Sequence, residues 1–85
     1  MKRLYFMGGH KRAAAALLFG EQEDFQEEDY QKYQELEVVL HQDGRFSVWG
    51  NLTEDADLLR DTKPDKQGVI AKLLPLADEV LEEEE

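Results

Sequence analysis

A β-hairpin is the strongest structural signal in this amino-acid sequence. Two runs rich in Val, Leu, Phe and Trp flank Asp43-Gly44, a dipeptide that favours tight hairpin turns. A three-residue loop over 42–44 pairs Leu40 with Phe46, whereas a two-residue loop would mix apolar and polar side chains on both faces. We therefore predict a hairpin over 36–50 with Gly44 in the left-handed conformation of a bulge. Its first face is expected to be buried and consists of Leu36, Val38, Leu40, Phe46 and Val48.

The second face of this hairpin places Val39 and Trp49 among polar side chains. Covering an apolar pair on an otherwise polar sheet face lowers the free energy, because it removes apolar surface from water. We expect that cover to come either from a C-terminal helix around Leu73 and Leu76 or from a second subunit. Val39 and Trp49 are therefore the candidate contacts of a homodimer interface.

The N-terminal segment predicts a strand followed by a helix. Four consecutive apolar residues, Leu4 to Met7, indicate a short strand buried on both faces, and Gly8-Gly9 ends it. Segment 10–19 contains four alanines and two leucines, a composition that favours a helix. A second strand over 10–19 is the alternative that this segment leaves open.

The C-terminal half predicts two further helices. Thr53 can cap a helix whose first turn holds Glu54, Asp55 and Asp57, where the helix dipole favours acids. After a break at 63–65, apolar residues recur at helical spacing as far as residue 81. Proline at position 75 cannot donate a backbone hydrogen bond, so this last helix should kink or restart there.

These elements predict one small α+β domain. A chain of 85 residues can bury a modest core but not two. We expect an N-terminal strand, a helix, the hairpin and C-terminal helices packed on one sheet face, all within residues 1–81. The four glutamates at 82–85 are expected to form an acidic disordered tail.

The net charge restricts the classes of partner. The chain carries 20 acidic and 10 basic residues, for a formal charge of −10. Four of the bases lie within residues 1–12, so the rest of the chain is more acidic still. This charge disfavours direct binding of nucleic acid or of an anionic membrane, because both attract Lys and Arg and repel carboxylates. A partner selected by charge is expected to be a basic protein.

Cysteine is absent, which suits a reducing compartment and excludes disulfides and thiolate metal sites. The apolar run AAAALLF at 13–19 is much shorter than the ~20 residues of a membrane-spanning helix. The sequence GEQED that follows it does not resemble a signal-peptide cleavage site. We therefore expect a cytoplasmic protein.

No motif for catalysis or for a cofactor is present in the sequence. The two histidines, His10 and His41, have no metal or triad spacing, and Ser47 is the only serine. The glycines at 8 and 9 lack the spacing of a phosphate-binding loop. Glu21, Asp24, Glu27 and Glu28 could supply oxygen ligands, but no calcium-loop pattern contains them. We expect no enzyme activity, no cofactor and no metal site.

The stretch EQEDFQEEDYQKYQELE, residues 21–37, is the candidate functional site. Eight of its 17 residues are carboxylates, and three aromatic residues lie among them. Whether 21–34 form a helix or a loop is left open; as a helix, the carboxylates would recur about every 3 Å, close to the phosphate spacing of a DNA strand. Solubility tails are poor in aromatic residues, whereas interfaces use them as anchors. The predicted partner-binding residues are Glu21, Glu23, Asp24, Phe25, Glu27, Glu28, Asp29, Tyr30 and Tyr33.

These observations lead us to expect a non-enzymatic binding module. It would bind a basic, nucleic-acid-handling protein and occupy the nucleic-acid site of that protein with carboxylates in place of phosphates. Small acidic inhibitors of this kind occur in phages and mobile elements, which is an analogy of class only. The alternatives are a solvated acidic spacer and a structural or accessory subunit that dimerises through Val39 and Trp49.

Overall fold

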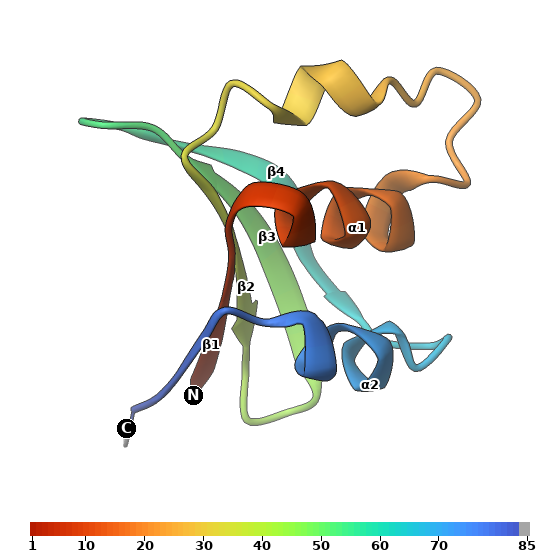
Figure 1. The fold of residues 1–85 in the computed structure, drawn as a ribbon. Coiled ribbons are helices and arrows are strands. Elements are labelled where there is room, and N and C mark those ends of the chain that lie inside the picture. Colours follow the sequence, from red (N-terminus) through yellow and green to blue (C-terminus); the bar gives the residue numbers. More distant parts are fainter. Residues whose placement is uncertain (84–85) are drawn as a thin grey trace.

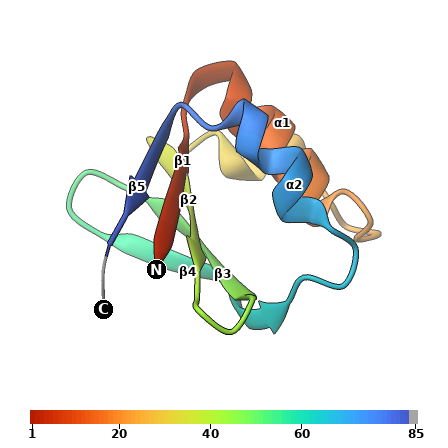
Figure 2. The ribbon, with the colours of Figure 1, turned by 90° about the horizontal axis from the view of Figure 1, so that it is seen from below.

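The computed structural model describes residues 1–83, with all of their side chains except that of Glu27. Five strands form one antiparallel sheet in the order β4-β3-β2-β1-β5. Both α-helices pack on one face of this sheet, which we call the inner face (Figures 1 and 2). The α+β prediction is thus confirmed. In chain order, the elements are β1 (Lys2–Phe6), α1 (Gly8–Phe19), the 3-10 helix η1 (Glu27–Tyr30), β2 (Glu35–Leu40), β3 (Arg45–Asn51), β4 (Ala56–Pro64), α2 (Val69–Leu73), the 3-10 helix η2 (Leu74–Leu76) and β5 (Glu79–Glu82).

The hairpin of β2 and β3 has the predicted register. Leu40 pairs with Phe46, and Gly44 has a φ of +84°, so the three-residue loop is confirmed. Four of the five predicted core residues of this hairpin are fully buried on the inner face. Leu40 is only partly buried, because it is the last residue of β2 and adjoins the exposed loop 42–44.

The N-terminal strand and helix are also confirmed. In α1, the buried residues Ala14, Ala15, Leu18 and Phe19 lie on one helical face, and the alanines let the helix approach the sheet closely. The burial of β1 is one-sided rather than two-sided: Leu4 and Phe6 are buried, whereas Arg3 and Tyr5, which alternate with them along the strand, are only half-buried. The reason is that no helix in the described part of the chain covers the other face of the sheet, the outer face (Figure 2).

The predicted helix after Thr53 is wrong. Residues 56–64 instead form β4, which pairs with β3 across a tight turn closed by the bond from the Leu52 amide to the Asp55 carbonyl, 2.7 Å. The capping signal at Thr53 stabilises a helix only weakly. Pairing with β3 provides a ladder of backbone hydrogen bonds along an edge that would otherwise be unpaired, and it therefore prevails. Glu54 and Asp55 therefore lie in a β-turn and not in the first turn of a helix.

The last predicted helix is shorter than its apolar spacing suggested. It consists of α2 and the 3-10 turn η2, in which Pro75 occupies the first turn, as expected for a restart. Ala77 is extended, and residues 79–82 form β5 against the free edge of β1. Because a strand there satisfies the backbone groups along that edge, sheet pairing prevails over the helical pattern.

The expected boundary between domain and tail falls inside β5. Glu82 pairs with Lys2, and the Glu83 amide donates to the Met1 carbonyl, 2.8 Å. The Met1 ammonium donates in turn to the Glu83 carbonyl, 2.9 Å. The remaining tail residues, 84 and 85, lie outside the described residues. Over the described part of the chain, no helix has the length and apolar character to cross a membrane.

The graded burial of the hairpin leads to a first prediction. Leu36→Ala should lower the free energy of unfolding by about 2–5 kcal/mol, because it leaves a cavity under a fully buried strand. Leu40→Ala, its matched control at the half-buried end of the same strand, should cost clearly less. Urea unfolding of both variants checks the order; equal losses would contradict the observed register.

Candidate acidic interface

The acidic stretch is neither a continuous helix nor an open loop. Turns occupy residues 20–24 and 31–34, and η1 contributes a single 3-10 turn between them. The segment leaves the end of α1 and returns above that helix to enter β2 (Figure 1). The helix and loop alternatives that the sequence left open for 21–34 are therefore each partly present.

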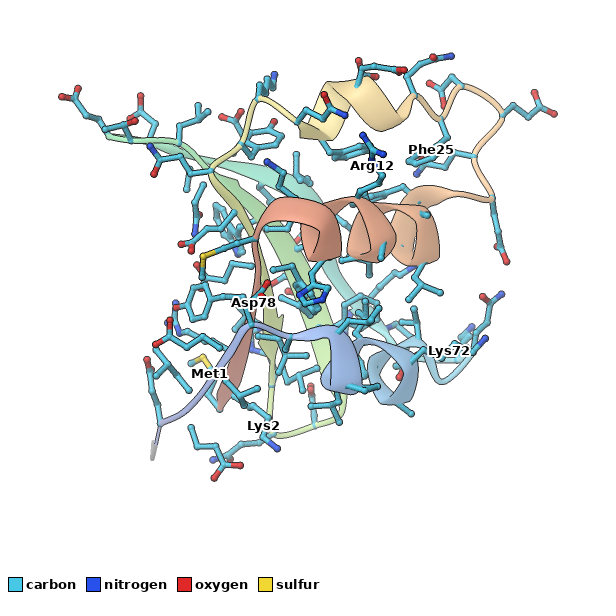
Figure 3. The ribbon with its side chains drawn as sticks, in the orientation of Figure 1. Met1, Lys2, Arg12, Phe25, Lys72 and Asp78 are labelled. Carbon is cyan, nitrogen blue, oxygen red and sulfur yellow. The ribbon has the colours of Figure 1, made fainter. Side chains whose placement is uncertain are left out.

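Stacked aromatic rings attach this segment to the domain. The Tyr30 ring stacks on Phe19 of α1, with ring centres 4.9 Å apart and planes 5° apart. Phe25 stacks on Tyr30 at 5.8 Å, and lies between the acidic loop and α1 (Figure 3). The same Phe19 ring also contacts Arg60 of β4. The Arg60 guanidinium lies 4.5 Å from the centre of this ring and donates to the Leu18 carbonyl.

Tyr33 fixes the end of the acidic segment in the core. It is 4% exposed, and its ring lies where a side chain on Gly50 would stand, about 2.7 Å from the position of a Cβ. Its hydroxyl donates to the Asp57 carboxylate, 3.0 Å, and burial together with this bond raises the pKa of Tyr33 to about 12. The Lys11 ammonium donates to the Tyr33 and Gln31 carbonyls, which holds the 31–34 turn against α1.

The aromatic residues of the segment make contacts within the chain, and their role as anchors for a partner stays a prediction. Tyr33 is a core residue, and Phe25 and Tyr30 are half-buried in contacts within the chain. These aromatic residues attach the acidic segment to its own domain. These internal contacts could not be predicted from the sequence. Phe19, which contacts Tyr30, and Gly50, which contacts Tyr33, lie far from these rings in the chain.

The acids of the same segment point outward. Exposed side chains belong to Glu21, Glu23, Asp24, Glu28 and Asp29. None of these five carboxylates makes a hydrogen bond or ion pair with another residue among 1–83 whose side chain is described. The acids that do form ion pairs within that range lie elsewhere: Glu37 and Glu83 with Arg3, Glu82 with Lys2, and Asp78 with His10. The predicted site residue Glu27 begins η1, and its side chain lies outside the described residues.

Two further acids join this surface from the β3–β4 turn. The Gln34 side chain donates to the Thr53 hydroxyl, 2.7 Å, and the Gln34 amide donates to the Asn51 carbonyl, 2.8 Å. These bonds place the turn next to the end of the acidic segment, along the upper edge of the molecule in Figure 1. We call this surface the acidic edge; it comprises Glu21, Glu23, Asp24, Glu28, Asp29, Glu54 and Asp55. Glu54 and Asp55 belong to this surface because β3 and β4 form a second hairpin over 45–64.

Val39 and Trp49 lie on the outer face of the sheet. Val39 is 5% exposed and Trp49 is half-buried. Leu73 packs into the core on the inner face, so the expected cover of Trp49 by the C-terminal helix is wrong. Beside this pair, Arg3 donates to the Glu37 carboxylate, 2.8 Å, and that bond raises the pKa of Arg3. Trp49 pairs with Leu58 of β4, which is 48% exposed.

Of the histidines and Ser47, His10 lies on α1, whereas His41 and Ser47 both line a hollow on the outer face of the sheet. His10 contacts Asp78 at the start of α1, 2.8 Å away, and the Met7 amide and His10 lower the pKa of Asp78. His41 adjoins the hairpin loop, and Ser47 is buried within β3. Among the side chains described, no group of three His, Asp or Glu residues is arranged to hold a metal ion.

The comparisons with known proteins add no further constraint on the site. No protein-family model matches the chain, and neither a curated protein nor a solved structure matches it.

The environment of Tyr33 predicts how stability depends on pH. The folded-state pKa of about 12 exceeds the usual value of 10, so the neutral phenol stabilises the fold fully below pH 10. Between pH 10 and 12 the unfolded chain loses this proton first, and stability falls. Tyr33→Phe should cost about 1 kcal/mol at pH 8 through loss of the bond to Asp57.

Urea unfolding of the wild type and Tyr33→Phe at pH 8 and pH 11 checks this prediction. The stability difference between the two proteins should shrink at pH 11, because only the wild type can ionise at this position. A difference that stays constant across the two pH values would contradict the assignment of the raised pKa to Tyr33.

Proposed function

We propose that this protein is a non-enzymatic binding module that presents its acidic edge to a basic, nucleic-acid-handling protein. In this function the carboxylates take the place of phosphates in the nucleic-acid site of the partner. The observation that carries the proposal is a set of exposed carboxylates that form no ion pair with a described residue, on a segment that aromatic stacking holds in place. We place this function in the cytoplasm, because a chain without cysteine suits a reducing compartment.

The unpaired state of these carboxylates favours binding of a base. An acid that already forms an internal ion pair must give up that contact, whereas the five acids of 21–29 whose side chains are described have no such contact with a described residue to lose. The net charge of −10 also attracts a basic partner over a distance, which increases the association rate at low salt.

The internal anchoring of the segment also favours binding. Ordering a loose acidic loop on association would cost roughly 0.5–1.5 kcal/mol for each immobilised side chain, in addition to the backbone cost. The stack of Phe25, Tyr30 and Phe19 and the buried Tyr33 have already fixed the backbone of the segment. The aromatic rings thus support binding indirectly, by holding the carboxylates in position.

A matched pair of charge reversals tests the proposal. Glu23→Lys with Glu28→Lys changes the acidic edge, and Asp61→Lys with Glu79→Lys makes the same change of net charge on β4 and β5. All four side chains are exposed, so each substitution should shift stability by about 0.5 kcal/mol or less. A partner would first be isolated by affinity capture from source lysate and then purified.

The first pair should abolish binding of the purified partner, and the second pair should weaken it only slightly. Raising salt from about 0.05 to 0.2 M should weaken wild-type binding by orders of magnitude if six or more charge contacts form. Nucleic acid should compete with this protein for the partner. Equal effects of the two pairs, or no competition by nucleic acid, would contradict the proposal.

A second candidate function is that of an accessory subunit that dimerises through the outer face. The observation that favours it is the apolar surface there: Leu58 beside Trp49 is 48% exposed, and Leu81 on β5 is 40% exposed. A second copy of the chain would cover these side chains together with Trp49 and Val39.

Sedimentation velocity over a range of concentrations tests this candidate. Leu58→Lys should shift a dimer to monomer, whereas Leu74→Lys, which changes a similarly exposed leucine of η2, should leave the dimer unchanged. The fluorescence of Trp49, the only tryptophan, should shift to the blue as the dimer forms. A monomer with constant fluorescence at every concentration would rule out dimerisation through the outer face.

A further inference from the structure

A pocket lies on the inner face of the sheet, away from the outer face, and borders the acidic edge at Glu21. The end of α1, the strands β3 and β4 and the connection from β4 into α2 enclose about 480 Å³. These elements can be followed in Figure 2. The volume is within the range of roughly 300–1,000 Å³ that is usual for small-molecule sites.

One side of the pocket is apolar. Leu17 and Phe19 of α1, Phe46 of β3 and Val69 of α2 contribute to its lining. Leu17 is 37% exposed although it is a large apolar residue on a helix that otherwise buries its leucine and phenylalanine side chains. A ligand with an apolar body would remove this leucine from water.

The other side of the pocket is basic. Arg60 and Lys63 of β4 both line it, and their cationic groups lie 4.5 Å and 5.7 Å from the ring centres of Phe19 and Phe46. Within residues 1–83, neither base lies at ion-pair distance from a described carboxylate. This contrasts with Lys2 and Arg3 of the same chain, which both form ion pairs with glutamates.

The two acids of the pocket lining do not neutralise these bases. The Asp65 carboxylate accepts hydrogen bonds from the amides of Val69 and Ile70, at 2.8 and 3.3 Å. Glu21 is exposed at the rim. Burial and the Arg60 charge lower the pKa of Lys63, and these effects exceed the opposing effects of Glu21 and Asp65. An anion between Arg60 and Lys63 would therefore relieve a repulsion present in the free protein.

We propose that this pocket binds a small amphipathic anion, with its acidic head between Arg60 and Lys63 and its apolar body against Leu17, Phe46 and Val69. The ligand class is an organic acid with a short hydrocarbon body. Charge-assisted bonds would fix the head, and burial of the apolar body would supply the remaining affinity. The pocket shares Glu21 with the acidic edge, but the proposed ligand contacts Arg60, Lys63 and the apolar lining and does not require a protein partner at that edge.

The proposal is tested by titrating the full chain with three probes. Binding is monitored through amide and side-chain chemical shifts in NMR spectra. The probes are octanoate, 1-octanol as the same body without charge, and acetate as the head alone. Octanoate should shift signals of Leu17, Phe46 and Val69 in a saturable manner, and the other two probes should bind more weakly. Signals of the outer face, such as that of Trp49, should not move.

Lys63→Gln removes the charge and keeps most of the side chain, and Lys72→Gln on α2 is its matched control outside the pocket lining. We expect about a tenfold or larger loss of octanoate affinity in the first variant and none in the second. Three results would each overturn the proposal: octanoate producing no saturable shifts at the pocket, octanol binding as tightly as octanoate, and both variants losing affinity equally.

Discussion

The core of this fold is built on the apolar stripe on the inner face of β2 and β3, and α1 and Leu73 of α2 pack against it. Leu36, Val38, Phe46 and Val48 are fully buried there, and the pairing of Leu40 with Phe46 fixes the register that brings them together. Because side chains alternate along a strand, a shift of one residue would turn this stripe outward and leave α1 without a surface to cover. The domain therefore depends on a hairpin whose turn is determined by two adjacent residues, Asp43 and Gly44.

The acidic edge depends on this core through aromatic contacts. Tyr33 reaches the sheet at Gly50, where the absence of a side chain leaves room for the ring, and Tyr30 stacks on Phe19 of α1. The free energy of aromatic burial offsets the repulsion among carboxylates that lie close together in the chain. A purely acidic loop of the same length would have no such support and would be expected to fluctuate.

Sequence reasoning succeeded where the decisive contacts are local. The turn at Asp43-Gly44, the alternation along 36–48 and the alanine-rich run of α1 were sufficient to predict the hairpin, its register and the first helix. It failed for β4 and β5, because their strand character comes from pairing with β3 and β1, and not from their own weak helical signals. The acidic residues of the candidate site stay a prediction, whereas the burial of Tyr33 could not be predicted because it depends on Gly50, 17 residues away in the chain.

The bonds that join Met1 to Glu83 place the two described ends of the chain side by side. In Figure 1 this corner lies opposite the acidic edge. A fusion partner or surface tether at either end would therefore project away from the carboxylates and leave them accessible. The same proximity makes the protein suitable for circular permutation, with a short linker across the old ends and new ends in the exposed hairpin loop 42–44.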